Sequence, residues 1–467
     1  MKRCIGIALI AGLWAGSAAP SAAEPMPPPI QRLTRDVYKE LVEINTTESV
    51  GDTYAAAQAM AARLIAAGYP RADVQAFQSG PRRGNLVARL RGSSKRKPIL
   101  LVAHTDVVEA KREDWTTDPF KLVEKDGYFY GRGTSDDKDM AAAWVVNMIR
   151  WKREGYKPDR DLVLVLETDE ELGDRHGLGI RWLIEHHRDL LDAAYAINEG
   201  GEVEVKEGKP FANGIQTAEK RGQGFWIEAR NPGGHSSLPR KDNAIYEIAD
   251  ALGRLERYEF PVLLNDTTRG FFDKMSAIEH GQLAQDMKSL ISAGPDPAAL
   301  ARLSAQPPYN AQIRTTCVAT RLEGGHADNA LPQLARAMIN CRIVPGQTAA
   351  QVQQELERVF EDPKLAVTVI PRDPGSEPSA MNAELLAAVE KTSAKFWPGV
   401  PVMPTMTAGA TDGRFLRAAG IPTYGHSGVA TDIFDIRAHG KDERVGVQAM
   451  FDGVEYLYEL VKALSGG

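Results

Sequence analysis

The chain has 467 residues, of which 43% are hydrophobic and 25% charged, and its formal net charge is −6. This composition is that of an ordinary globular protein, so it excludes a mainly disordered or collagen-like chain. The acidic balance argues against a protein that binds nucleic acid by neutralising phosphates, because such proteins are usually basic. At about 150 residues per domain, the length predicts about two or three domains.

The first 23 residues have the pattern of a secretory signal peptide. Lys2 and Arg3 precede an apolar stretch from Ile5 to Ala15, and a run of small residues ends at Ala23. This order of charge, short apolar core and small residues is typical of an export signal. A membrane-spanning helix needs about 20 apolar residues, which neither this stretch nor a later one provides. We therefore expect a periplasmic or secreted protein without a membrane span.

The next part of the chain predicts alternating helices and strands, after a stiff proline linker at Pro25–Pro29 that is expected to lie outside the core. Continuous apolar runs are typical of strands that are buried on both faces. Helices are expected over residues 33–44 and 52–67 and from Ser135 onward, and strands over residues 85–90, 98–103, 161–166 and 193–198. This alternation predicts an α/β fold with an open, mostly parallel sheet flanked by helices.

The pattern changes after about residue 217 and resumes near residue 373. Between these points we expect an inserted α+β unit, with an irregular insertion at residues 261–308. Its elements are expected as strands over residues 225–230, 317–320 and 337–344, and as helices over residues 243–257 and 349–360. The predicted organisation is a signal peptide (1–23), a catalytic domain in two parts (24–217 and 371–467) and a lid domain (218–370).

Cys317 and Cys341 are the cysteines of the expected mature chain. Two cysteines in a large exported chain permit one disulfide but do not make a disulfide scaffold. Buried free thiols are the interpretation that we favour from the sequence alone.

Acidic residues and a histidine follow the predicted strands. Ligands of open α/β sheets gather beyond the carboxyl ends of the strands, so these side chains are expected to converge. The candidates are His104 and Asp106, the pair Glu170 and Glu171, Glu199, and Asp136 in a glycine-containing turn before a helix. One histidine and several carboxylates form a donor set suited to zinc or a similar divalent ion.

Each candidate also has a purely structural interpretation. His104 could be satisfied by a nearby carboxylate, Asp136 could cap a helix, and Glu170 and Glu171 could form a solvated acidic loop. The functional interpretation gives the members of the glutamate pair different tasks, because one can bind metal while the other accepts a proton from metal-bound water. Asp106 lies two residues after His104, so in an extended segment it could hold the far ring nitrogen of His104.

Five ordered motifs together resemble a known enzyme family. They are His104-Thr-Asp106, Gly131-Arg-Gly-x-x-Asp136-x-Lys138, Asp169-Glu170-Glu171, Asn198-Glu199-Gly and Ala438-His439-Gly-Lys-Asp-Glu443. The resemblance is to the two-zinc metallopeptidases, which include glutamate carboxypeptidase, aminoacylase, acetylornithine deacetylase, succinyl-diaminopimelate desuccinylase and the carnosine dipeptidases. It covers nearly the whole expected mature chain.

The resemblance implies a role for each metal-site residue. His104 and Glu199 would bind one Zn²⁺, Glu171 and His439 would bind a second, and Asp136 would bridge both ions. Asp136 is chosen over Asp137 because the family's bridging acid precedes x-Lys, and His439 over its rival His426 because Glu443 follows it. Glu170 would be the general base, and Asp106 would support His104.

The resemblance also implies a lid that forms a homodimer. His235, in the motif Gly233-Gly-His235-Ser-Ser-Leu-Pro239, would stabilise the oxyanion, often across the dimer. Asn329 and Arg342 match lid positions near the substrate's carboxylate, and Arg414 matches another substrate-contact loop. For Arg342 and Arg414, ordinary salt bridges are an equally weighted interpretation.

The expected activity is hydrolysis of an amide bond in short peptides with a free carboxylate, of dipeptidase or carboxypeptidase type, through a water between two zinc ions. The alternative is an N-acyl amino acid amidohydrolase of aminoacylase or deacetylase type. A third hypothesis, from another class, is a periplasmic zinc- or peptide-binding protein without turnover. Such a binder would need neither a free glutamate beside Glu171 nor His235.

Overall fold

The computed structural model describes residues 25–173, 175–372 and 375–466, so the expected signal peptide lies outside the described residues. A ten-stranded sheet forms the larger part of the molecule, with the order β1-β2-β6-β3-β7-β17-β9-β8-β18 and β16 paired to β9. Its strands are β1 (Val74–Gly80), β2 (Arg83–Leu90), β3 (Arg96–His104), β6 (Arg160–Glu167), β7 (Tyr195–Asn198), β8 (Val203–Lys206), β9 (Lys209–Glu219), β16 (Val402–Thr407), β17 (Thr423–Gly425) and β18 (Ala430–Asp432).

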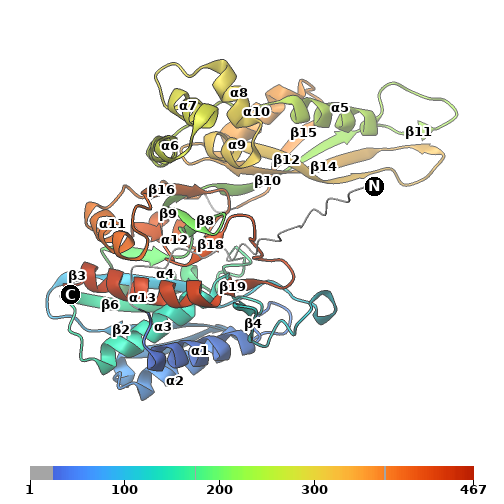
Figure 1. Ribbon diagram of the computed structural model, residues 1–467. Coiled ribbons are helices and arrows are strands. Elements are labelled where there is room, and N and C mark those ends of the chain that lie inside the picture. Colours follow the sequence, from blue (N-terminus) through green and yellow to red (C-terminus); the bar gives the residue numbers. More distant parts are fainter. Residues whose placement is uncertain (1–24, 174, 373–374, 467) are drawn as a thin grey trace, which may run out of the picture.

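Helices cover both faces of this sheet (Figure 1). Ile99 and Leu101 of β3 belong to a core with α1, α2, α3, α11 and α13, whereas Leu100 and Val102 belong to a core with α4 and α12. The helices are α1 (Pro28–Glu43), α2 (Thr53–Ala66), α3 (Lys138–Arg153), α4 (Ile180–His186), α11 (Ala383–Phe396), α12 (Gly413–Ala418) and α13 (Val447–Leu464). The α/β fold with a mostly parallel central sheet is thus confirmed, and the continuous apolar runs reflect burial on both faces.

The second unit is a four-stranded antiparallel sheet of order β12-β14-β10-β15, which lies at the top of Figure 1, above the large sheet. Two helices pack on one face and form a separate core with it. The elements are β10 (Arg221–Arg230), β12 (Thr316–Gly324), β14 (Leu334–Ile343), β15 (Ala366–Val369), α5 (Ala244–Arg257) and α10 (Ala349–Phe360). We call this unit the lid.

Cys317 of β12 and Cys341 of β14 form a disulfide, so the expectation of free thiols is wrong. The two residues face each other in the antiparallel register of the strands. Register between strands is a property of the folded sheet, and spacing along the chain does not show it.

The segment at 261–308 is not irregular, contrary to the sequence-based expectation. It contains α6 (Asp266–Ile278), α7 (Gly281–Leu290) and α8 (Pro297–Ser304), and α9 (Pro307–Ile313) follows directly. Phe272 and Met275 of α6 pack with Ala212 of β9 and Met403 of β16, so this helical insert rests on the large sheet. We call α6–α9 the helical insert.

The proline linker is also different from the expectation, because α1 begins at Pro28 and Met26 is buried in the core. Proline suits the first turn of a helix, where its missing N–H has no intrahelical partner. The described residues include two smaller sheets and no helix with the length and apolar character of a membrane span. Their strands are β4 (Val123–Lys125), β5 (Tyr128–Tyr130), β19 (Arg444–Gly446), β11 (Gly234–His235) and β13 (Ala330–Leu331).

Candidate metal centre

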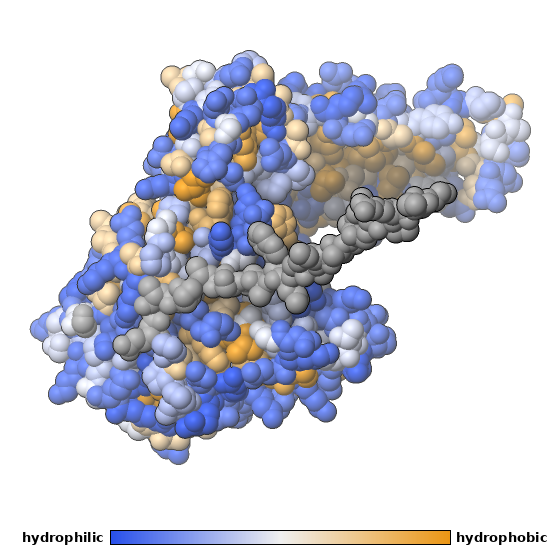
Figure 2. All heavy atoms as spheres, in the orientation of Figure 1, coloured by the Kyte–Doolittle hydropathy of each residue, from blue (hydrophilic) through white to orange (hydrophobic). Residues whose placement is uncertain are grey.

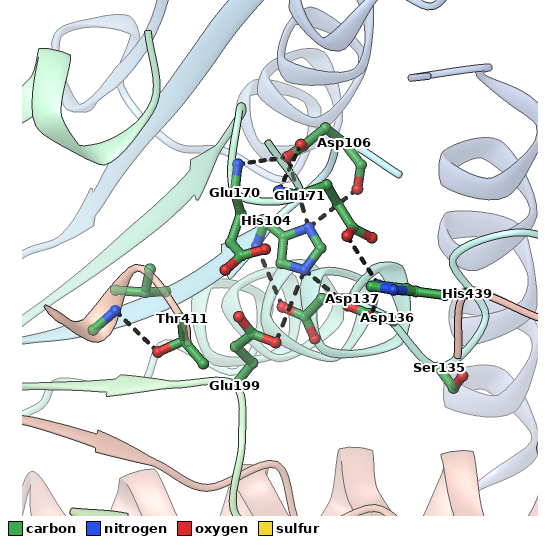
Figure 3. Close-up of polar contacts among 12 residues, drawn as sticks. His104, Asp106, Ser135, Asp136, Asp137, Glu170, Glu171, Glu199, Thr411 and His439 are labelled. Atoms are coloured by element: carbon green, nitrogen blue, oxygen red, sulfur yellow. Dashed lines mark hydrogen bonds and ion pairs between the residues drawn. The ribbon is translucent and has the colours of Figure 1, made fainter. Parts of the chain in front are cut away.

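One cluster of potential metal ligands lies at the carboxyl ends of β3 and β7 (Figure 3). His104 is the last residue of β3, and Glu199 directly follows β7. The Nε2 atom of His104 lies 3.0 Å from Oδ1 of Asp136 and 3.9 Å from Oε2 of Glu199. Because parallel strands end at the same edge of the sheet, residues far apart in sequence converge there.

A second cluster shares Asp136 with the first. The Nε2 atom of His439 lies 3.0 Å from Oδ2 of Asp136 and 2.9 Å from Oε2 of Glu171. The two oxygens of one carboxylate therefore face different histidines. This is the arrangement that a carboxylate bridging two cations requires.

The donor atoms fit a pair of divalent cations. Zinc binds nitrogen and oxygen at about 2.0–2.2 Å, so donors around one tetrahedral ion lie roughly 3.4 Å apart. The distances of 2.9–3.9 Å within the clusters bracket this value. In addition, Oε1 of Glu171 is buried without a hydrogen-bond partner among the described atoms.

The ionisable groups of the clusters also favour the binding of cations. Contacts with Asp136 and Glu171 raise the pKa of His439 to about 10. Burial raises the pKa of Glu199 well above its usual value, and the nearby charge of Glu170 acts in the same direction. Carboxylates gathered out of water favour bound protons or bound metal, and metal ligation requires that both imidazoles give up the extra proton.

Asp106 supports the centre in a different way from the expected one. Its backbone carbonyl oxygen, at 3.1 Å, is closer to Nδ1 of His104 than its carboxylate, at 3.7 Å. The carboxylate instead accepts hydrogen bonds from the backbone N–H groups of Glu170 and Glu171, at 3.3 and 3.2 Å. Asp106 thereby contacts both His104 and the backbone of Glu170 and Glu171, and it links their positions to each other.

Glu170 belongs to neither cluster of candidate ligands. In Figure 3 its carboxylate points to the same side of the site as Glu199. Burial raises the pKa of Glu170 well above its usual value, while the charge of Arg414 acts in the opposite direction. A carboxylate beside the clusters with a raised pKa has the position and the basicity of a general base.

Glu443 and Arg132 support the centre, although the sequence motifs alone indicate no role for either residue. Arg132 donates a 2.6 Å hydrogen bond to Glu443, and the other carboxylate oxygen of Glu443 accepts from the backbone N–H of Ser135. Both residues are buried. Their contacts tie the turn that carries Asp136 to the segment that carries His439, and both residues stood within the motifs already identified.

The structure distinguishes Asp136 from its rival Asp137, and His439 from its rival His426. His426 is buried, with Nδ1 2.7 Å from the carbonyl oxygen of Gly214 and Nε2 2.7 Å from the hydroxyl of Tyr456. Asp137 accepts a hydrogen bond from the backbone N–H of His104, and it lies in neither cluster. Asp136 and His439 are the members of each pair that the fold brings into the centre.

The lid residues do not reach the clusters within this chain. His235 is exposed on β11, with Nδ1 2.7 Å from Oγ of Ser237, and Figure 1 shows β11 at the outer end of the lid. Asn329 lies beside it, because its carbonyl oxygen accepts from the N–H of Ser236. Arg342 is an exposed residue of β14, opposite Thr316.

Residues 100–463 match the model of Peptidase family M20/M25/M40. The chain is 30% identical over 385 residues to the human "N-fatty-acyl-amino acid synthase/hydrolase PM20D1", covering 78% of this chain and 74% of that protein. It is 29% identical over 383 residues to the "Probable carboxypeptidase S-like 2" of Dictyostelium discoideum, covering 78% and 71%.

Solved structures share the fold at lower identity. An M20 family metallo-carboxypeptidase, Sso-CP2 from Sulfolobus solfataricus, aligns with a TM-score of 0.67 at 17% identity over 94% of this chain and 99% of that one. Human carnosine dipeptidase 1 aligns with a TM-score of 0.62 at 17% identity, over 94% and 97%. At this identity the similarity concerns the fold alone.

Proposed function

The chain belongs to peptidase family M20/M25/M40 and is a hydrolase, and we propose that it cleaves an amide bond in short peptides with a free carboxylate. The reaction is of dipeptidase or carboxypeptidase type. The observation that carries this proposal is Glu170, a carboxylate beside the two ligand clusters that belongs to neither of them. A site that only stored metal would have no use for such a residue.

We propose Zn²⁺ as the native metal, with two ions per subunit. His104 and Glu199 would hold one ion, Glu171 and His439 the other, and Asp136 both. When bound, such ions supply Lewis-acid chemistry, which makes water a better nucleophile and polarises the scissile carbonyl.

Glu170 carries the proton transfers in this proposal. Its carboxylate accepts a proton from the attacking water while the water oxygen bonds to the carbonyl carbon. It then returns that proton to the amine nitrogen as the carbon–nitrogen bond breaks. The products are a carboxylic acid and a free amine, so all atoms of the water are accounted for.

We propose that two basic residues bind the substrate's carboxylate, namely Arg342 of the lid and Lys220, which joins β9 to β10. Lys220 is fully buried, and its Nζ atom contacts Oγ1 of Thr316 at 3.5 Å. Burial lowers the pKa of Lys220 to about 7, and the nearby charge of Arg342 acts in the same direction. Two cations close together attract an anion, so we assign Arg342 and Lys220 to the substrate's carboxylate. We assign Arg414, whose charge acts on Glu170, to the part of the substrate next to the scissile amide.

We also propose a homodimer through the lid. Strand β12 is an edge of the lid sheet, and Val318 and Leu322 on it are more than half exposed. An exposed apolar edge strand is prone to pair with another chain. Figure 2 shows apolar residues gathered along the strands of the lid, and Figure 1 shows β11 at the outer end of the lid. A second copy could therefore bring its His235, with Asn329, to the reacting carbonyl.

A second candidate is hydrolysis of N-acyl amino acids by the same chemistry. The human relative that is 30% identical is named an N-fatty-acyl-amino acid synthase/hydrolase, which favours this candidate specifically. A peptide and an N-acyl amino acid present the same amide and carboxylate, and they differ in the group on the carbonyl carbon. The expected export to the periplasm or medium fits either substrate.

The test is a substrate panel with the purified protein and added Zn²⁺. We expect turnover of dipeptides or N-acyl amino acids that carry a free carboxylate, and none of their amidated forms. Bound zinc without turnover of any substrate would instead favour the hypothesis of a binding protein.

A further inference from the structure

A cavity of about 740 Å³ adjoins the candidate metal centre at Glu199. It is bounded by β8 and β9, by the loop that follows β16, by α6 and α9 of the helical insert, and by residues 431–436. Ligand-binding cavities have volumes of about 300–1,000 Å³, so this one is large enough for a sizeable substrate group. The cavity therefore extends from Glu199 at the metal centre to α6 and α9 of the helical insert.

Much of the cavity wall is apolar. It includes Phe211, Phe271, Met275, Tyr309, Phe434 and Ile436. Phe434 and Ile436, which lie in this lining, are 76% and 69% exposed. A group of exposed apolar side chains at one site marks a binding surface, whereas single exposed apolar side chains are common and carry no such meaning.

The helical insert is held firmly against the large sheet, so this wall has a defined position relative to the metal centre. At Gly270 of α6 an added Cβ atom would lie 2.8 Å from Pro404 of β16. Gln312 of α9 donates a 2.8 Å hydrogen bond to the carbonyl oxygen of Met406. A bulky residue at position 270 could not approach β16 this closely.

The charges of the cavity decide which end of a substrate enters it. Glu199, Glu202, Glu204 and Glu279 line it, and Lys206 is the basic residue of the lining, with Nζ 3.5 Å from Oε1 of Glu279. These carboxyl groups offer no positive charge to the substrate's free carboxylate, and Lys206 already contacts Glu279, whereas Arg342 and Lys220 are the cations proposed to bind that carboxylate. The uncharged group on the carbonyl carbon is therefore the part that fits.

We propose that this cavity binds a long acyl chain of an N-acyl amino acid, with the scissile carbonyl at the metal centre and the chain between α6, α9 and residues 433–436. The proposal rests on the proposed amide hydrolase and selects the second of its two substrate classes. It also assigns a function to the helical insert, which forms one wall of the acyl cavity.

The test compares kcat/KM for N-acetyl-, N-octanoyl- and N-palmitoyl-phenylalanine with that for the dipeptide Ala-Phe. We expect kcat/KM to rise with chain length by up to about fourfold per methylene until the cavity is filled, because each buried methylene contributes to binding. We expect Phe434→Ser and Phe271→Ser to lower the octanoyl-to-acetyl ratio by about fivefold or more.

Leu263→Ser is the matched control, because Leu263 is an exposed apolar residue near the helical insert that does not line the cavity. It should leave the ratio unchanged. Turnover of Ala-Phe or the acetyl substrate without any gain from chain length would overturn the acyl cavity and leave the amide hydrolase standing. No turnover of any substrate by the zinc-loaded protein would overturn both proposals. Equal losses for all substrates in Phe434→Ser, with an unchanged melting temperature, would also contradict the acyl cavity.

Discussion

The Nε2 atom of His439 lies 3.0 Å from Oδ2 of Asp136, and the other oxygen of this carboxylate faces His104. One aspartate thus joins two ligand clusters, which hold His104 and Glu199 on one side of it and Glu171 and His439 on the other. The buried pair of Arg132 and Glu443 holds the two segments in register around it. The shared carboxylate makes the two halves of the centre dependent on each other.

This sharing leads to a prediction for metal content. We expect His439→Ala to lose the metal of its own cluster and keep most of the other, whereas Asp136→Ala weakens both, because its carboxylate serves both clusters. The measurement is metal per chain after dialysis, by elemental analysis. His176→Ala, which removes an exposed histidine that contacts Glu48, is the control and should retain full occupancy. Equal metal content in the two variants would contradict a bridging role.

Replacing the proposed base should separate chemistry from metal binding. We expect Glu170→Gln to lower kcat by about 10²–10⁴-fold, the usual contribution of a general base, and to retain both metals. Stopped-flow or end-point hydrolysis assays measure the first effect and elemental analysis the second. If turnover persisted at the wild-type rate, another group would have to accept the proton.

The carboxylate anchor predicts a change in KM. We expect Arg342→Ala to raise KM by about tenfold to a hundredfold, since a charge-assisted hydrogen bond contributes about 1.5–3 kcal/mol. Lys220→Met should also raise KM while leaving the protein as stable or more so, because it removes a charge that is buried without an acidic partner among the described residues.

Arg321→Ala is the control for this pair, because Arg321 pairs with Glu323 on the same sheet. It should leave KM unchanged. A fall in kcat at constant KM for Arg342→Ala would point to the reacting carbonyl rather than the carboxylate.

The buried His426 predicts how stability depends on pH. Burial lowers its pKa from 6.5 to about 4, so it is neutral in the folded protein at neutral pH. Between these values the unfolded chain binds a proton that the folded protein does not, and stability therefore falls as pH drops from about 6.5 to about 4.

The measurement is the free energy of unfolding in urea at several pH values, with metal removed from all samples. We expect His426→Gln to show a shallower decline over this window than the wild type. Parallel curves for the two proteins would mean that His426 does not titrate in this way.

The disulfide between Cys317 and Cys341 predicts a stabilised lid. It closes a loop with a sequence separation of 24, for which the loss of unfolded-state entropy corresponds to about 3 kcal/mol. We expect the Cys317→Ser/Cys341→Ser double variant to lower the free energy of unfolding by up to this amount. The reduced wild type should match the variant, and identical stability of the oxidised and reduced protein would contradict the prediction.

The sequence-based predictions failed mainly where prolines begin helices. Pro28, Pro297 and Pro307 each stand in the first turn of a helix, although the sequence predicts linker or irregular chain around them. Proline interrupts the interior of a helix but suits its start, so the same residue can give opposite signals. The long apolar runs raised no such ambiguity, and β3 and β6 were predicted to within two residues at each end.

The sequence by itself determined the kinds of chemical group available and the strands that deliver them. Apolar runs that end in His104, Glu167 and Asn198 mark the edge of a parallel sheet. The strands are apolar because they are buried on both faces, and polar residues occur where the strands end because ligands and solvent reach that edge. Only the tertiary structure decided which of these groups meet. The choice of His439 over His426, the backbone contact of Asp106 and the pairing of Cys317 with Cys341 depend on distances between chain segments, and those distances are set by packing.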